Sequence, residues 1–233
     1  MTLSIAAASE SEPSVNNWGQ FTFENDAFGV AEPTDDGYSN GIGYVWGSTD
    51  IASFDKIDMP DWLRSASGWS YINQAEQGQY SVSYGIIQGM FTPSDLDTDQ
   101  LVVDDRPYAG VLLWQAKLRH YDNDIATSLA LNLGVVGPAS LAQETQSMIH
   151  AVIDARDPQG WDNQLENEPV FRIESEYLNR FGQLTLSDNL TSDLSFYGQA
   201  GIGNLRSDAG FGVTFRLGSG LDETYAVINP TAS

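Results

Sequence analysis

The segment between residues 134 and 169 combines a titratable side chain with a helical pattern. It reads GVVGPASLAQETQSMIHAVIDARDPQGWDNQLENEP and carries His150, one of two histidines in the chain. A neutral imidazole can take a proton from water and so act as a general base. Helical spacing places His150 on one stripe with Gln143, Gln146 and Asp154. Such a stripe is also typical of a solvated helix face, so a catalytic and a structural interpretation both remain open.

A second group of polar residues lies near the N-terminus. Glu24, Asn25 and Asp26 end one strand-like stretch, and Asp35, Asp36 and Gly37 precede the next one. Carboxylate and amide oxygens are the donors that hard cations prefer, so the two ends of this hairpin could converge on a cation. Asp, Asn and Gly also favour turns for backbone reasons, and that interpretation suits 35–37 better than 24–26.

A third motif, DDRPYAG at residues 104–110, begins another strand-like stretch. It reads as a proline-containing turn in which Arg106 pairs with the acids beside it or holds an anionic ligand. The structural role is the one we favour.

Most of the chain alternates apolar residues with small or polar ones, which is the period of a β-strand. The pattern predicts about eight strands, each close to the ~9–11 residues with which a tilted strand crosses a membrane. The stretches are 18–28, 38–48, 79–91, 111–121, 127–135, 170–181, 193–205 and 211–217.

Two folds fit these strands. A soluble sandwich buries its apolar faces, whereas an outer-membrane barrel turns them to lipid and lines its interior with polar residues. The barrel is favoured by charges within strands that can pair across a polar lumen, namely Arg119, Arg172, Glu174, Glu176 and Arg216. No stretch has the ~20 apolar residues of a membrane-spanning helix. We therefore expect an all-β fold, an antiparallel transmembrane β-barrel of the outer-membrane type with a short helix in a loop.

The helix is predicted over residues 139–153, because apolar residues recur there at helical spacing opposite the polar stripe. Ser140 is a candidate N-cap, with Gln143 three residues on. His120, the other histidine, lies on the apolar register of its strand, which favours packing over catalysis.

Length and the lack of a composition shift indicate one domain. We expect a barrel over 17–218 with a helical insertion at 139–154. Residues 1–16 are expected to be disordered or a signal-peptide remnant, and 219–233 a tail or a truncated end. The net charge of −22, with 32 acidic and 10 basic residues, argues against nucleic-acid binding. The absence of cysteine excludes disulfides and zinc–thiolate sites.

The order and spacing of five motifs resemble the LpxR-type lipid A deacylase family. In this sequence they are FENDAF, TDDGYSNGI, DDRPYAGVLLW, GVVGPASLAQETQSMIH and GWDNQLENEP, and the resemblance runs from about Trp18 to Phe181. It implies a twelve-stranded barrel in the outer membrane of a Gram-negative bacterium. It also implies a calcium-dependent hydrolysis of the 3′-linked acyloxyacyl ester of lipid A, at a site between the barrel wall and a helical loop.

The resemblance assigns roles to five residues. His150 matches the catalytic histidine and would activate a water, and Gln146 matches a glutamine that shares the site. Asn25 and Asp26 match the site's Asn-Asp pair, with Asp26 expected to hold calcium. Ser39 stands where a member has threonine.

Three departures qualify these expectations. A glutamate that the family can place six residues after the histidine is Arg156 here, so an acidic partner of His150 would have to be Asp154 or Asp157. About eight strands are visible instead of twelve, and the last residues lack the terminal aromatic typical of such barrels. We therefore expect a truncated chain, a smaller barrel, or exposed sheet edges that favour aggregation. The acidic balance suits a phosphorylated glycolipid poorly, and we expect bridging divalent cations and the lumen-side residues Arg106, Lys117 and Arg119 to offset it.

Two alternatives to the enzyme stay open. One is a non-catalytic outer-membrane barrel that binds lipopolysaccharide or serves the envelope structurally, and the other is a soluble calcium-binding sandwich. The oligomeric state is not determined by these patterns.

Overall fold

A computed structural model describes residues 17–25, 38–48, 51–74, 78–122, 124–187, 189–219 and 221. Eight strands form one antiparallel sheet in chain order, β1 to β8, in which each strand pairs with the next along the chain. The strands are β1 (Asn17–Asn25), β2 (Tyr38–Ser48), β3 (Gln79–Phe91), β4 (Ala109–Tyr121), β5 (Ile125–Val136), β6 (Glu168–Ser187), β7 (Leu190–Gly203) and β8 (Asp208–Gly218). The antiparallel all-β fold expected from the alternation is confirmed.

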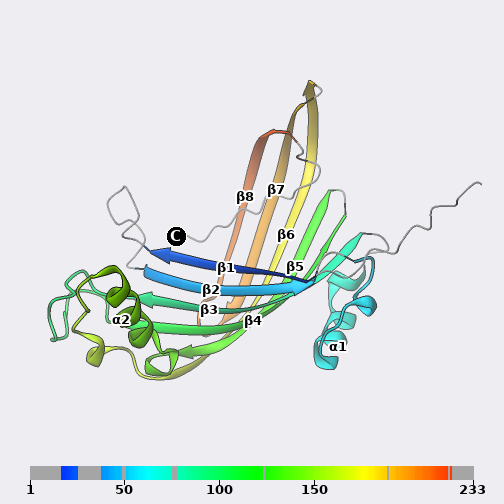
Figure 1. Ribbon diagram of the computed structural model, residues 1–233. Helices are drawn as coiled ribbons and strands as arrows, with labels where there is room; N and C mark the ends of the chain where they lie inside the picture. The colour runs from blue at the N-terminus through cyan, green and yellow to red at the C-terminus, as the bar shows by residue number, and fades with distance from the viewer. Residues whose placement is uncertain are drawn as a thin grey trace, which may run out of the picture.

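In the part of the chain that the structure describes, two α-helices and four short 3₁₀ turns lie between the strands. They are η2 (Phe54–Lys56), α1 (Asp61–Trp69), η3 (Tyr71–Gln74), η4 (Pro138–Ser140), α2 (Ala142–Ile153) and η5 (Trp161–Asn163). None of the helices in the described ranges is long and apolar enough to span a bilayer. Figure 1 shows α2 near one end of strands β1 to β4 and α1 near the other end.

The strand register divides the sheet into two chemically different faces. Residues directly opposite each other in antiparallel strands share a face. Starting from the pair Trp114 and Leu133, the register collects apolar residues on one face across all eight strands. Many of them are exposed, including Phe21, Tyr44, Ile86, Leu133, Phe171, Ile173, Phe211, Val213, Phe215 and Leu217.

The opposite face carries an ion-pair network. Lys117 Nζ lies 2.5 Å from Glu176 Oε2, and Arg172 bonds both Glu174 and Asp208 at 2.9 Å. Further along, the Arg216 Nε donates to Asp193 at 3.0 Å. Charged residues paired on one face and exposed apolar residues on the other are the pattern of a sheet that faces lipid on one side only. The soluble sandwich interpretation is wrong, because a sandwich would bury this apolar face.

Both α-helices pack on the apolar face. A cluster of buried residues from the segment 51–72, including Phe54, Leu63 and Ile72, covers Val82 and Leu118 at one end of the strands. A second cluster, Met90, Tyr108, Ala142 and Trp161, holds α2 at the other end. On β3 and β4 the apolar face is therefore covered near both strand ends, whereas Ile86 in the middle of β3 is exposed.

Helix α2 differs from its prediction at its N-terminus. The helix begins at Ala142, after the 3₁₀ turn η4, and its N-cap is Leu141 in the left-handed conformation at φ 58°. Ser140 makes no capping hydrogen bond, so the predicted N-cap is wrong. The reason is packing: the Ser140 side chain is fully buried over Gly110 instead of facing the helix N-terminus.

The segment 51–74 was missed entirely by the pattern analysis. His120, in contrast, packs as predicted, since it is buried with its ring 4.8 Å from that of Tyr80.

Candidate active site

Helix α2 turns two of its four polar-stripe residues, Gln146 and His150, toward the sheet. The side chain of Gln146 is 1% exposed and that of His150 is 9% exposed, whereas Val152 on the outer side is 82% exposed. Leu141, Met148 and Ile153 are also exposed. The inner face therefore combines these two polar side chains with Ala142 and Ile149, whereas a helix on a water-soluble protein turns its apolar residues inward and its polar residues outward. The solvated-face interpretation therefore fails for Gln146 and His150, although Gln143 and Asp154 are exposed as it requires.

The close approach of α2 to the sheet depends on a residue without a side chain. Gly110, near the start of β4, lies directly beneath Ser140 and Ala142, and a Cβ at this position would collide with both. Its cross-strand partner Met90 is fully buried in the cluster that holds the helix. The Gln88 side chain adds a hydrogen bond of 2.6 Å to the Ser140 carbonyl. These contacts fix the distance of the helix from the sheet and its position along the strands.

The tautomer of His150 follows from its hydrogen bond. Its Nδ1 lies 2.5 Å from the main-chain carbonyl oxygen of Arg156. A carbonyl oxygen only accepts hydrogen bonds, so Nδ1 carries the proton and Nε2 keeps its lone pair. The expected acidic partner, Asp154 or Asp157, is replaced by this carbonyl. The reason is that the helix ends at Asp154 in the left-handed conformation, and the chain then turns its main chain back toward the ring.

Gln146 is oriented by a tryptophan. The Trp161 Nε1 donates a 2.8 Å hydrogen bond to Gln146 Oε1, and both side chains are buried. An indole N–H is only a donor, so it fixes which end of the amide is which. With Oε1 occupied, Gln146 keeps its amide N–H groups for another acceptor. Trp161 belongs to the GWDN motif, but sequence reasoning gave it no role, and its signal was only an aromatic residue in a polar loop.

The loop 92–108 supports this pair from outside. Tyr108 packs on Trp161 with ring centroids 5.0 Å apart. The amides of Ser94 and Arg106 donate to the Asp105 carboxylate and lower its pKa to about 2. Asp105 therefore stays charged and holds the loop in place, so the structural interpretation of the 104–110 motif agrees with these contacts.

The backbone brings the N-terminal candidates to the same end of the sheet. Asn25 pairs with Asn40, Asn40 with Met90, and Met90 with Gly110, in one row across β1 to β4. The register between β2 and β3 shifts at Ser39, which marks an irregularity there. Asn25 and β3 are two strands apart, roughly 10 Å between backbones. Asp26 lies outside the described residues. For Asn25 and Ser39 the structure describes the backbone but not the side chains.

The basic residues expected to meet an anionic substrate lie elsewhere. Lys117 and Arg119 are on the polar face, opposite the face that carries Gly110 and α2. Lys117 pairs there with Glu176. This is the lumen-side position expected of Lys117 and Arg119, and it separates both residues from the face that carries α2. Arg106 lies in the loop beside Asp105, 3.5 Å from its carboxylate.

The oxygen donors at the strand ends suit a calcium ion by their chemistry. Asn25 and Asp26 supply amide and carboxylate oxygens, and Ser39 and Asn40 follow across the hairpin. Within the described ranges, no group of three or more His, Asp or Glu side chains could hold a metal ion. The carboxylates of Glu24, Asp26, Asp35 and Asp36 are not part of these described side chains.

Comparison with known proteins identifies the family of this chain. The family profile described as outer membrane protein LpxR matches residues 1–233, the whole chain. The chain belongs to this family. LpxR-family proteins are located in the outer membrane, and the apolar sheet face is accordingly the lipid-facing one.

A solved structure supports the family's fold. LpxR from Salmonella typhimurium superposes with a TM-score of 0.65 at 19% sequence identity, over 88% of this chain and 64% of that one. At this identity the likeness concerns the fold. This chain thus spans less than two thirds of the LpxR chain that it resembles. A search of curated protein sequences gives no match.

Proposed function

We propose that this LpxR-family protein is a lipid A deacylase, which hydrolyses the 3′-linked acyloxyacyl ester by metal-assisted attack of water. The observation that supports it most is the inverted helix α2, with Gln146 and His150 buried toward the sheet and apolar residues outward. A polar site beneath an apolar helix on a lipid-facing wall is accessible from within a leaflet. A membrane lipid is the class of substrate that reaches such a site.

The proposed chemistry needs one proton to be moved. His150 Nε2 takes a proton from a water molecule while the water oxygen attacks the ester carbonyl carbon. The bond between that carbon and the sugar oxygen then breaks, and the proton passes from His150 to the departing oxygen. The Arg156 carbonyl keeps the imidazole in the tautomer that this step requires.

Negative charge develops on the ester carbonyl oxygen during the attack. The amide N–H groups of Gln146, left available by Trp161, can donate to this oxygen. Asp26, beside Asn25, is the residue that we propose to hold calcium, with Ser39 near it. A bound calcium ion would polarise the ester carbonyl there.

Replacement of His150 tests the proposal. His150→Ala should abolish acyl release from lipid A, measured by mass spectrometry, while leaving heat-modifiable migration of the folded protein unchanged. Glu144→Ala, an exposed position on the same helix, is the matched control and should keep its activity. Retained acyl release in folded His150→Ala would contradict the role of this residue.

A second candidate function is a non-catalytic barrel that binds lipopolysaccharide. It is favoured by Arg156, which occupies the position where the family can have a glutamate. The same assay distinguishes the two, because this candidate requires lipid A to be bound and recovered intact.

A further inference from the structure

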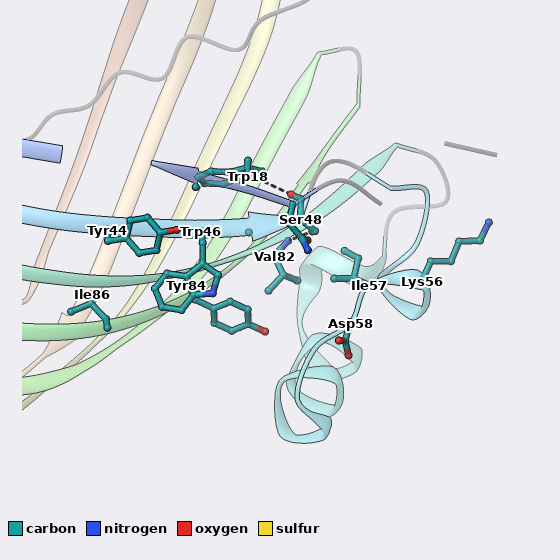
Figure 2. A pocket seen from close by; sticks show the side chains of 13 residues that line it. Trp18, Tyr44, Trp46, Ser48, Lys56, Ile57, Asp58, Val82, Tyr84 and Ile86 are labelled. Atoms are coloured by element: carbon teal, nitrogen blue, oxygen red, sulfur yellow. Dashed lines mark hydrogen bonds between the residues drawn. The ribbon is translucent and has the colours of Figure 1, made fainter. Parts of the chain in front are cut away.

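A groove lies on the lipid-facing side, at the end of the strands opposite α2. It has a volume of about 920 Å³ and separates strands β1 to β3 from the segment that leads into α1. Figure 2 shows Tyr44, Trp46 and Tyr84 on the strands, with Ile57 and Asp58 on that segment. The groove is far from the candidate active site, because its residues Ser48 and Val82 lie at the other end of their strands.

The floor of the groove is a ladder of aromatic rings. Tyr44 stacks on Trp46 at 5.5 Å, Trp46 meets Tyr84 at 6.0 Å, and Tyr84 stacks on Trp114 at 6.4 Å. Trp62 of α1 continues the ladder at 6.1 Å from Trp114. Aromatic rings gathered near one strand end are typical of the interfacial girdle of an outer-membrane barrel. From Ser48 to Tyr44 the groove follows β2 for about 13 Å toward the membrane interior.

One polar atom in the groove has no partner. The hydroxyl oxygen of Tyr84 is buried and makes no hydrogen bond with any described residue. A buried donor without an acceptor is costly, so it indicates a missing partner at this point. Tyr84 pairs with Trp46, two residues or roughly 7 Å from the end of β2.

The outer side of the α1 segment carries exposed aromatic residues of the kind found at a membrane–water interface. Trp69 is 92% exposed, and Trp62 and Tyr71 are also exposed. The segment is nevertheless firmly docked, because Tyr71 Oη donates to the Ser128 carbonyl at 2.9 Å and Arg64 bonds two carbonyls of the preceding turn. Exposed tryptophan and tyrosine on a rigid unit at a strand end suit the headgroup level of a bilayer. The groove therefore opens between headgroup level and hydrocarbon.

The rim of the groove has an acidic balance. The segment that forms it carries Asp55, Asp58 and Asp61 against Lys56, and Asp58 and Lys56 line the groove itself. Carboxylates attract an ammonium group and repel a purely anionic headgroup. Of the common bacterial phospholipids, an ethanolamine headgroup fits this rim better than a glycerol headgroup.

We propose that the groove binds one phosphatidylethanolamine molecule from the leaflet on the α1 side. One acyl chain lies along the aromatic floor, the Tyr84 hydroxyl donates to an ester oxygen, and the ammonium lies near Asp58. The site is independent of the hydrolytic function, because α2 and the groove occupy opposite ends of the strands.

Native mass spectrometry of the full chain tests this site. The folded protein is incubated in detergent with palmitoyl-oleoyl phosphatidylethanolamine or with the corresponding phosphatidylglycerol, and retained lipid is measured. We expect one retained phosphatidylethanolamine and weaker retention of phosphatidylglycerol. No retained lipid, or equal retention of the two, would overturn the proposal.

Two exposed apolar positions provide a matched pair of variants. Ile86 is 48% exposed and lines the groove, and Leu133 is 43% exposed on the same face outside it. Ile86→Trp should reduce retention about tenfold, the effect of displacing roughly two methylene groups from contact. Leu133→Trp should leave retention unchanged, and equal behaviour of the two variants would contradict the assignment. If Ile86→Trp does not fold, Tyr84→Phe, which removes only the hydroxyl, should lower retention several-fold.

Discussion

At the scale of single residues, each buried polar side chain of the candidate site is oriented by one hydrogen bond. One of these bonds goes to a main-chain carbonyl and the other comes from an indole N–H. His150 is held by a carbonyl of the chain that follows α2, and Gln146 by one indole N–H. Neither partner could be identified from residue types. A main-chain carbonyl has no sequence signature, and a tryptophan in a loop is compatible with many roles.

The first prediction concerns Arg156. Its main chain orients His150, whereas its side chain is exposed and only 3.4 Å from exposed Asp97. Arg156→Ala should therefore keep acyl release within about twofold of the unchanged protein, as expected for an exposed substitution. The measurement is the rate of acyl release from lipid A. A large loss would mean that the side chain itself acts in the site.

The second prediction concerns Trp161, a positioning residue for Gln146. Trp161→Phe keeps a ring in the cluster but removes the donor to Gln146 Oε1, a bond worth about 1 kcal/mol or roughly fivefold in rate. We expect kcat to fall with KM unchanged, because the amide acts on charge that develops only during the reaction. Trp69→Phe, at an exposed tryptophan, is the control and should be neutral. A rise in KM alone would indicate a role in substrate binding instead.

At the scale of elements, the strands could be predicted and the helices only in part. Alternation in β2 and β3 gave their bounds because each residue faces either lipid or the polar network. The helical period of α2 could be recognised in the sequence, but the face that the helix buries could not. The rule that apolar residues face the protein assumes water outside, and it reverses beside lipid. Helix α1 was missed because its nine residues, DWLRSASGW, mix small and polar residues without a long apolar stripe.

The docking of α2 gives a prediction at this scale. Gly110→Ala places a Cβ against Ser140 and Ala142, so the helix must move away from the wall. We expect a large loss of acyl release, with the strands still folded by heat-modifiable migration. Gly212→Ala, where a Cβ meets nothing within 4 Å, is the matched control and should be silent. Full activity of Gly110→Ala would show that the position of α2 is not critical.

At the scale of the whole molecule, the two faces of the sheet separate charged residues from apolar ones. Basic residues such as Lys117, Arg172 and Arg216 are used in ion pairs on the polar face. The exposed aliphatic and aromatic residues gather on the other face, where lipid takes the place of a core. The fold class could be predicted because apolar residues alternate with polar or small residues along the strands.

The faces can be tested with adjacent residues of β8. Val213 is exposed on the lipid-facing side and Thr214 lies on the other side. Val213→Arg should lower the free energy of unfolding in lipid by about 2–4 kcal/mol, the cost of a cation near the bilayer midplane. Thr214→Arg should cost much less, since it joins the polar network. Urea titration of protein folded into vesicles measures the free energy of unfolding of both variants. A larger loss for Thr214→Arg than for Val213→Arg would contradict the assignment of the faces.

We propose that this LpxR-family chain releases an acyl group from lipid A at a site formed by α2 and the adjoining strand ends. The most direct measurement is mass spectrometry of lipid A after incubation with the folded protein, first with calcium and then with a chelator. We predict loss of the 3′-linked acyloxyacyl group with calcium and intact lipid A with the chelator. Intact lipid A under both conditions would contradict the claim.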